Sequence, residues 1–309
     1  MRRWLKRIGL GLLGFVAALT LFSVVYDALS SDGVAAQKLY AGPYVEVDGR
    51  ALAYRRWGSH GSPIVLIGGF IEPSDAWREV GPLLGRTHRV YALDLPPFGY
   101  SERKGPYTLD TWLDEVEGFE HALRIVHPTL VGHSLGAADV VGEALRHPKA
   151  LRGIVLLDGD ALSGGGSVPS WIGDLAIEPY FTALYRLLTG WNWIFHQGLK
   201  TAYGPYGPKL THTELERWKQ PFRVIGTARA FAQLLPHGIQ GYTLADLRRV
   251  KDVPGLVIWG AKDTTDPVSA GRASAAALRA PFVLLPRAAH LSMLVDPGSI
   301  ARDVNRMAG

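Results

Sequence analysis

Short, predominantly apolar runs recur along the chain, and each ends in a turn or in polar residues. There are six of them, at residues 63–67, 89–93, 129–131, 153–157, 255–259 and 282–285. Runs of this kind are typical of strands that a sheet buries on both faces. Residues 44–47 and 51–57 lie on either side of an Asp48-Gly49 turn, which predicts a β-hairpin. We therefore expect eight strands.

Helical patterns separate most of these runs. They cover residues 74–84, 108–126, 136–145, 270–278 and 297–307. Thr108 is the expected N-cap of the longest of these helices. Strands that alternate with helices in this rhythm predict an α/β fold with a mostly parallel eight-stranded sheet and helices on both faces. In such sheets the functional side chains gather beyond the carboxyl ends of the strands.

The alternation stops between residues 161 and 247. This segment begins with a Gly-Ser-rich run at 163–167, which resembles a hinge, and continues as amphipathic helical stretches. Its aromatic residues are Trp171, Tyr180, Phe181, Tyr185, Trp191, Trp193, Phe195, Trp218, Phe222 and Phe231. We predict a helical cap at 161–247, inserted between core segments 44–160 and 248–309. An aromatic cap over a cleft would form an apolar pocket, although the same helices could instead only cover the sheet.

The N-terminus combines a basic cluster with an apolar stretch. Arg2, Arg3, Lys6 and Arg7 precede nineteen uncharged residues at 8–26, close to the ~20 needed to span a bilayer. We therefore predict that residues 8–26 form a transmembrane helix and that the membrane is a binding partner of the protein through this segment. The charge bias predicts that the N-terminus is cytoplasmic and that the rest of the chain lies on the extracytoplasmic side.

Cleavage is the alternative for this segment. The sequence Ala-Leu-Ser at 28–30 offers a fair cleavage site, and cleavage would make the protein secreted. The length of the apolar stretch favours an uncleaved anchor. Residues 1–29 are thus an anchor or a signal sequence, and the polar, small residues at 30–43 are a linker.

Composition excludes several classes of protein. The 309 residues include no cysteine, which rules out disulfides, a thiolate nucleophile and cysteine metal ligands. The net charge is +5, but part of that excess lies in the first seven residues. The sequence has no basic stripe with interleaved aromatic residues, so it does not indicate nucleic-acid binding. Without a spaced ligand cluster or a phosphate-binding glycine loop, we expect no metal and no organic cofactor.

The sequence Gly-His-Ser-Leu-Gly at 132–136 lies between a predicted strand and a predicted helix. This setting is typical of a nucleophile elbow, in which a strained turn exposes a serine hydroxyl. Gly132 and Gly136 would let strand and helix approach closely. Ser134 is the candidate nucleophile, and the N–H of Leu135 would face the oxygen of a bound carbonyl.

Ser134, Asp263 and His290 occur in the order nucleophile, acid, base, and each follows an apolar strand. A serine hydroxyl needs a neutral imidazole to take its proton, and a carboxylate orients and stabilises that imidazole. Asp266 is a rival for Asp263. Three lone histidines, His133, His212 and His237, fit structural or surface roles better than catalytic ones.

Five segments together resemble those of the α/β-hydrolase-fold serine hydrolases. They are Gly-Gly-Phe at 68–70, Asp-Leu-Pro-Pro-Phe-Gly-Tyr-Ser at 94–101, Gly-His-Ser-Leu-Gly at 132–136, Trp-Gly-Ala-Lys-Asp at 259–263 and Ala-His-Leu at 289–291. The resemblance runs from about residue 44 to the end, with 161–247 matching the variable cap. It implies that the N–H of Phe70 is the second oxyanion-hole donor, beside that of Leu135.

The resemblance also raises two points of difference. The usual His-Gly before the oxyanion residue is Gly68-Gly69 here, which removes a supporting side chain. Some members place the acid after the strand that ends at Leu157, so Asp158 is a further alternative to Asp263.

The resemblance predicts a hydrolase that cleaves a small apolar ester or related carbonyl compound through an acyl-enzyme on Ser134. Relatives that use aspartate as nucleophile, the haloalkane dehalogenases and epoxide hydrolases, are disfavoured by Ser134. Carbon–carbon bond hydrolases and non-haem peroxidases keep the serine and stay open. A catalytically silent binding or scaffold protein on the same fold is the hypothesis from another class.

Overall fold

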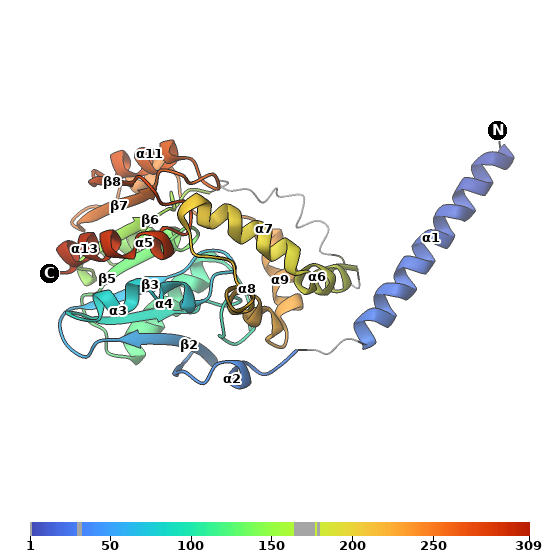
Figure 1. Ribbon diagram of the computed structural model, residues 1–309, viewed down its shortest axis with the longest axis horizontal. Helices are drawn as coiled ribbons and strands as arrows, with labels where there is room; N and C mark the ends of the chain where they lie inside the picture. The colour runs from blue at the N-terminus through green and yellow to red at the C-terminus, as the bar shows by residue number, and fades with distance from the viewer. Residues whose placement is uncertain (1, 30–32, 164–176, 178–179) are drawn as a thin grey trace.

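A mixed sheet with helices on both faces forms the body of the protein (Figure 1). The computed structural model describes residues 2–29, 33–163, 177 and 180–309, and within them the sheet has eight strands in the order β1-β2-β4-β3-β5-β6-β7-β8. The strands are β1 (Tyr44–Val47), β2 (Arg50–Trp57), β3 (Pro63–Ile67), β4 (Arg89–Leu93), β5 (Thr129–His133), β6 (Gly153–Leu157), β7 (Gly255–Gly260) and β8 (Phe282–Leu285). The predicted strands and fold class are confirmed.

The direction and the order of the strands together place a crevice at the centre of the sheet. β1 and β2 pair antiparallel, β2 is antiparallel to β4, and all the remaining pairs are parallel. β3 lies between β4 and β5, so the chain leaves β3 on one side and later returns to place β5 on the other. Loops that leave two neighbouring strands in opposite directions open a crevice at their carboxyl ends.

The helices of the described residues connect these strands or form the segment over the crevice. They are α1 (Arg2–Leu29), α2 (Ala36–Leu39), α3 (Val80–Leu84), α4 (Leu109–Ala122), α5 (Gly136–Arg146), α6 (Tyr180–Gly190), α7 (Asn192–Tyr203), α8 (His212–Lys219), α9 (Thr227–Leu234), α10 (Leu244–Leu247), α11 (Val268–Leu278), α12 (Ser292–Val295) and α13 (Pro297–Ala308). Short 3₁₀ turns add η1 (Ser74–Trp77), η2 (Pro148–Ala150), η4 (Gly204–Tyr206), η5 (Gln220–Arg223) and η6 (Leu235–His237).

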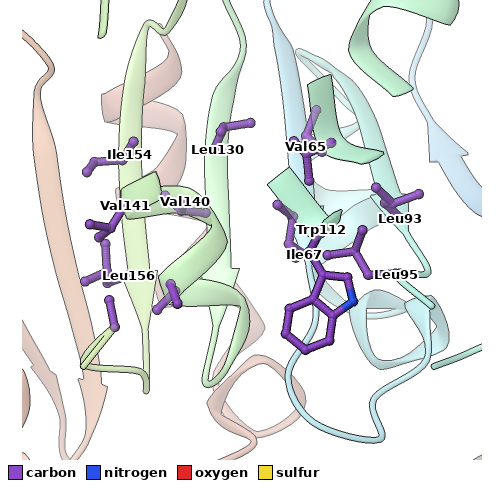
Figure 2. Packing of buried hydrophobic residues seen from close by; sticks show 14 of the residues in the cluster. Val65, Ile67, Leu93, Leu95, Trp112, Leu130, Val140, Val141, Ile154 and Leu156 are labelled. Carbon is purple, nitrogen blue, oxygen red and sulfur yellow. The ribbon is translucent and has the colours of Figure 1, made fainter. Parts of the chain in front are cut away.

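Each central strand contributes to two separate cores. Along β3, Val65 and Ile67 face α4 and α5, whereas Ile64 and Leu66 face α3 and α13. Figure 2 shows the first core, where strand residues lie against Val140 and Val141 of α5. Burial on both faces explains why these strands are apolar throughout rather than alternating.

Two predicted helices differ in extent. The expected helix over 74–84 is interrupted, because the ring of Pro82 is tolerated only in the first turn of a helix, and α3 therefore starts at Val80. The helix predicted to reach residue 126 ends at Ala122 instead. Arg124 adopts a left-handed conformation, and the N–H of Ile125 donates to the carbonyl of Glu120 over 2.8 Å, which closes the helix as a Schellman motif.

The segment between residues 180 and 247 is helical, with α6 to α9 lying beyond the carboxyl ends of the strands. We use the term cap for residues 180–238. The predicted hinge at 163–167 and the aromatic Trp171 fall largely or wholly outside the described residues.

The N-terminal helix α1 extends away from the body of the protein (Figure 1). Its stretch Arg7–Tyr26 has a mean hydropathy of 2.4 over 20 residues and is long and apolar enough to cross a membrane. Its C-terminal part contacts α6. The segment predicted as a linker packs on the body from residue 34 onward, where Val34 pairs with Val224.

Buried carboxyl groups line the contact between α4 and α5. Glu115 and Glu120 of α4 and Glu143 of α5 have oxygens that make no hydrogen bond within the described residues. Burial raises the pKa of Glu143 to about 9, and nearby Glu117 and Glu120 add to this rise. The group therefore holds its proton far more tightly in the folded protein than in the unfolded chain.

We expect Glu143→Gln to stabilise the protein at alkaline pH. Since the folded-state pKa lies above the ordinary 4.5, the unfolded chain loses this proton first, so stability falls as pH rises from about 4.5 to about 9 and levels off above that. At pH 9 the variant should be more stable than the natural protein by at least about 1.4 kcal/mol, the value of one pKa unit, and little different at pH 5. Thermal unfolding in detergent across this pH range measures the effect.

Glu79→Gln is the matched control, because the side chain of Glu79 is 55% exposed. Equal pH profiles for the two variants would contradict the assignment of alkaline instability to the buried carboxyl.

Candidate active site

Ser134 lies in a tight turn at the carboxyl end of β5, directly before α5. Its φ of 50° is in the left-handed region, which is strained for a serine. Its N–H donates to the carbonyl of Leu157 on β6 over 3.0 Å. A Cβ on Gly132 would overlap the carbonyl of Gly136, so only glycine allows the strand and helix to approach this closely.

The structure brings Ser134, His290 and Asp263 together. Ser134 Oγ lies 3.0 Å from His290 Nε2, and His290 Nδ1 lies 2.9 Å from Asp263 Oδ2. The other oxygen of Asp263 accepts the backbone N–H groups of Thr265 and Asp266. A carboxylate held in this way keeps Nδ1 protonated, which leaves the lone pair of Nε2 facing the serine hydroxyl.

The two alternative acids occupy other positions. Asp158 accepts hydrogen bonds from the N–H of Gly260, over 2.6 Å, and from the hydroxyl of Ser292. Burial raises the pKa of Asp158 to about 7, against the opposing effect of His133 and His290. Asp266 lines the cavity in front of the serine. The contact with the imidazole of His290 belongs to Asp263.

The backbone beside Ser134 presents two N–H groups. Phe70, which follows β3, and Leu135 both line the cavity next to the serine hydroxyl. Within the described part of the chain, neither N–H donates to a protein acceptor. The N–H of Gly69, by contrast, is taken by Glu72 Oε2 at 2.6 Å. The N–H groups of Phe70 and Leu135 therefore remain the candidate donors for a bound oxyanion.

A buried ion pair lies behind these groups. His133 Nδ1 is 2.6 Å from Glu72 Oε2, the same oxygen that accepts from Gly69, and His133 Nε2 is 2.7 Å from the carbonyl oxygen of His290. Because a carbonyl only accepts, Nε2 carries a proton, and Nδ1 donates to the carboxylate. One imidazolium thus ties the loop after β3 to the backbone of His290.

The charge on His133 depends on Glu72. Burial alone would lower the pKa of His133, but the charge and hydrogen bond of Glu72, together with Asp158 and the carbonyl of His290, raise this pKa to about 9. Sequence reasoning placed His133 among structural or surface histidines and overlooked Glu72. The only available signal was their position, because one directly precedes the serine and the other lies two residues after Phe70. His212 and His237 are exposed.

Close packing also explains two glycines around the serine. A Cβ on Gly69 would lie 2.8 Å from the Cβ of Ser134. A Cβ on Gly159, a residue that sequence reasoning did not single out, would overlap the carbonyl of Ser134. The loops after β3 and β6 can therefore touch the serine turn only because both positions lack side chains.

A cavity of about 670 Å³ opens in front of Ser134, within the size range of small-molecule sites. The cap supplies most of the apolar side chains in its wall. The apolar lining includes Phe181, Leu184, Leu188, Ile194, Phe195, Leu199, Phe222, Phe231, Leu235 and Ile239. Among the described lining residues there is no lysine or arginine, whereas Asp160 and Asp266 are present. In the described ranges, no group of three or more histidine, aspartate or glutamate side chains is placed to hold a metal ion.

Comparison with known proteins agrees with this geometry. The family model described as the alpha/beta hydrolase fold matches residues 62–297. The chain belongs to the alpha/beta hydrolase fold family.

Individual relatives of this alpha/beta hydrolase have diverse descriptions. It is 28% identical to the uncharacterized hydrolase YugF of Bacillus subtilis over 235 residues, which cover 73% of this chain and 82% of YugF. It is 38% identical to 2-hydroxymuconate semialdehyde hydrolase of a Pseudomonas species over 136 residues, 41% of this chain and 47% of that one.

One solved structure resembles almost the whole hydrolase. A membrane phospholipase A described as a bacterial virulence factor is 26% identical, with a TM-score of 0.69, and the match covers 99% of this chain and 98% of that one. A serine hydrolase of carbazole degradation has a TM-score of 0.71 at 21% identity, covering 86% and 97% of the two chains, and supports the fold alone.

We expect Glu72→Gln to destabilise this alpha/beta hydrolase. Removing one partner of a buried ion pair typically costs about 3–5 kcal/mol. Because the folded-state pKa of His133 lies above its ordinary 6.5, the contribution of the natural pair is complete below pH 6.5 and is lost as pH rises through about 9. Urea unfolding in detergent between pH 6 and 9 should show this pH dependence in the natural protein and a weaker one in the variant. An unchanged pH slope in the variant would contradict it.

Proposed function

We propose that the protein is a membrane-anchored serine hydrolase that cleaves esters of long apolar acyl chains. The observation that carries this proposal is the contact of Ser134 with His290, and of His290 with Asp263, at the wall of an apolar cavity. Membership of the alpha/beta hydrolase fold family supports a hydrolase.

The geometry supports a two-step mechanism. His290 Nε2 takes the proton of Ser134 as its Oγ attacks the ester carbonyl, and Asp263 stabilises the imidazolium that forms. The oxyanion accepts the N–H groups of Phe70 and Leu135. The imidazolium then gives its proton to the departing alcohol, which leaves an acyl group on Ser134. Water, deprotonated by His290, attacks this acyl-enzyme, releases the acid and restores the serine.

Charge in the cavity favours a neutral substrate. The relatives that cleave 2-hydroxymuconate semialdehyde and dienoate compounds act on acids, as their names state. The described lining here offers such an anion no lysine or arginine, and Asp160 and Asp266 would repel it. The carbon–carbon bond hydrolase stays the second candidate because of the sequence identity to those relatives.

The long match to a membrane phospholipase A supports an acyl ester of a membrane lipid as the natural substrate. We further propose that α1 remains as an anchor. Arg2, Arg3, Lys6 and Arg7 would keep its N-terminus in the cytoplasm and place the hydrolase domain on the extracytoplasmic side.

Replacement of the serine tests the proposal most directly. Ser134→Ala should lower p-nitrophenyl ester hydrolysis by about 10⁶-fold, the cost of losing the nucleophile of a triad, and should abolish labelling by a fluorophosphonate probe. Labelling of the natural protein at Ser134 distinguishes the enzyme from a silent scaffold. Full hydrolysis by the alanine variant would refute the mechanism.

Aspartate replacement separates Asp263 from its rival Asp266. Asp263→Asn should lower kcat by about 10⁴-fold, because the imidazole then adopts the wrong tautomer. Asp266→Asn is the matched control, since its carboxyl lines the cavity without holding His290. It should stay within about 10-fold of the natural kcat. The opposite ranking would give the role to Asp266.

Chain length tests the substrate class. The cavity volume and lining predict that kcat/KM rises along p-nitrophenyl acetate, butyrate, octanoate and laurate, because each buried CH₂ contributes about 0.8 kcal/mol. Hydrolysis of phospholipid in mixed micelles follows as the natural test. Preference for acetate, together with turnover of a 2-hydroxy-6-oxo-dienoate, would instead favour the carbon–carbon bond hydrolase.

A further inference from the structure

The cap carries an apolar surface that faces solvent. Leu184 and Leu188 of α6 are exposed, and Trp191 and Trp193, where α6 passes into α7, are 59% and 68% exposed. We call these four residues the cap rim. Exposed tryptophans together with leucines mark a site of protein or membrane contact, and tryptophan is enriched where membranes meet water.

The cap contacts the apolar N-terminal helix. Thr20 Oγ1 lies 2.6 Å from the hydroxyl of Tyr180, and α1 contacts α6. The candidate span ends at Tyr26. Thr20 lies six residues before that end, which is about 9 Å along a helix. If α1 crosses a bilayer, the start of α6 therefore lies below the surface of that bilayer.

The connection after α1 limits how far the domain can lie from a membrane. Helix α1 ends at Leu29, and Val34 is already held on the cap, since its N–H donates to the carbonyl of Arg223 and its carbonyl accepts from Ile225. Five residues of extended chain span at most about 18 Å. The cap therefore lies close to the end of the span, independently of the contact between Thr20 and Tyr180.

We propose that the cap rim inserts into the lipid bilayer that α1 crosses, and that the active-site cavity opens into the acyl region of that bilayer. The opening of the cavity into the bilayer is supported by Leu184 and Leu188, because they belong to the cap rim and also line the cavity. An acyl chain would pass between them from the membrane to Ser134 without crossing water. The insertion rests on the proposed membrane anchor, and the consequence for substrate entry rests in addition on the proposed hydrolysis.

The absence of cysteine makes the insertion measurable in the full chain. Trp193→Cys and, separately, Trp191→Cys are labelled with the fluorophore NBD and reconstituted into phosphatidylcholine vesicles. The matched control is Val126→Cys. Val126 is 65% exposed and precedes β5, at the edge of the sheet opposite the cap. Emission is then compared in vesicles with and without doxyl-labelled lipid.

Insertion predicts blue-shifted NBD emission at 191 and 193 and at least about twofold quenching by doxyl lipid, with little of either at 126. Emission at 193 and 191 that matches the control overturns the proposal. A blue shift without lipid quenching also overturns it, because it would show that a second copy of the chain covers the cap rim.

Repeating the measurement on a Ser134→Ala background separates insertion from catalysis. Quenching that persists without activity supports the insertion even where the proposed hydrolysis fails. A Trp191→Ser, Trp193→Ser double variant should lower hydrolysis of vesicle-embedded ester at least about fivefold and leave soluble p-nitrophenyl butyrate unchanged. Equal loss on both substrates would contradict lateral entry.

Discussion

Close backbone contact around Ser134 is the constraint on which the site depends. The turn after β5 touches the loop after β3 at Gly69 and the loop after β6 at Gly159, and side chains at either position would collide with it. Ser134 is thereby held in a strained conformation by three neighbouring strands. A parallel sheet can do this because its strands release their loops at one common edge.

The buried pair of Glu72 and His133 supports the loop after β3, which contains the candidate oxyanion donor. A histidine usually precedes the glycine of that loop in this family, and here that position is Gly68. Glu72 holds the N–H of Gly69, and His133 joins this carboxylate to the carbonyl of His290. The groups that would bind the oxyanion and accept the proton are thus positioned through one charged unit, which the burial of both partners makes sensitive to the loss of either.

The cap connects the site to the N-terminal helix. Helix α6 supplies Phe181, Leu184 and Leu188 to the cavity and also contacts α1. The same helix therefore forms both the wall of the cavity and the contact with the candidate membrane span. An apolar cavity, an exposed aromatic rim and a short connection to an apolar helix are the features that support the proposed lipid substrate.

The sequence by itself determined the sheet, the candidate triad and the apolar span. Strands, turns and helices each have a short-range residue pattern, and each candidate triad member directly follows a strand that such a pattern predicts. Helix ends were less predictable: Pro82 and the left-handed Arg124 set them through local backbone geometry. Only the tertiary structure decided that Asp263, rather than Asp158 or Asp266, contacts His290. It also decided that Glu72 pairs with His133 across 61 residues and that α6 lies against α1. Such contacts join side chains that are far apart in the chain. They depend on tertiary packing, so the periodicity and spacing of residues in the sequence do not predict them.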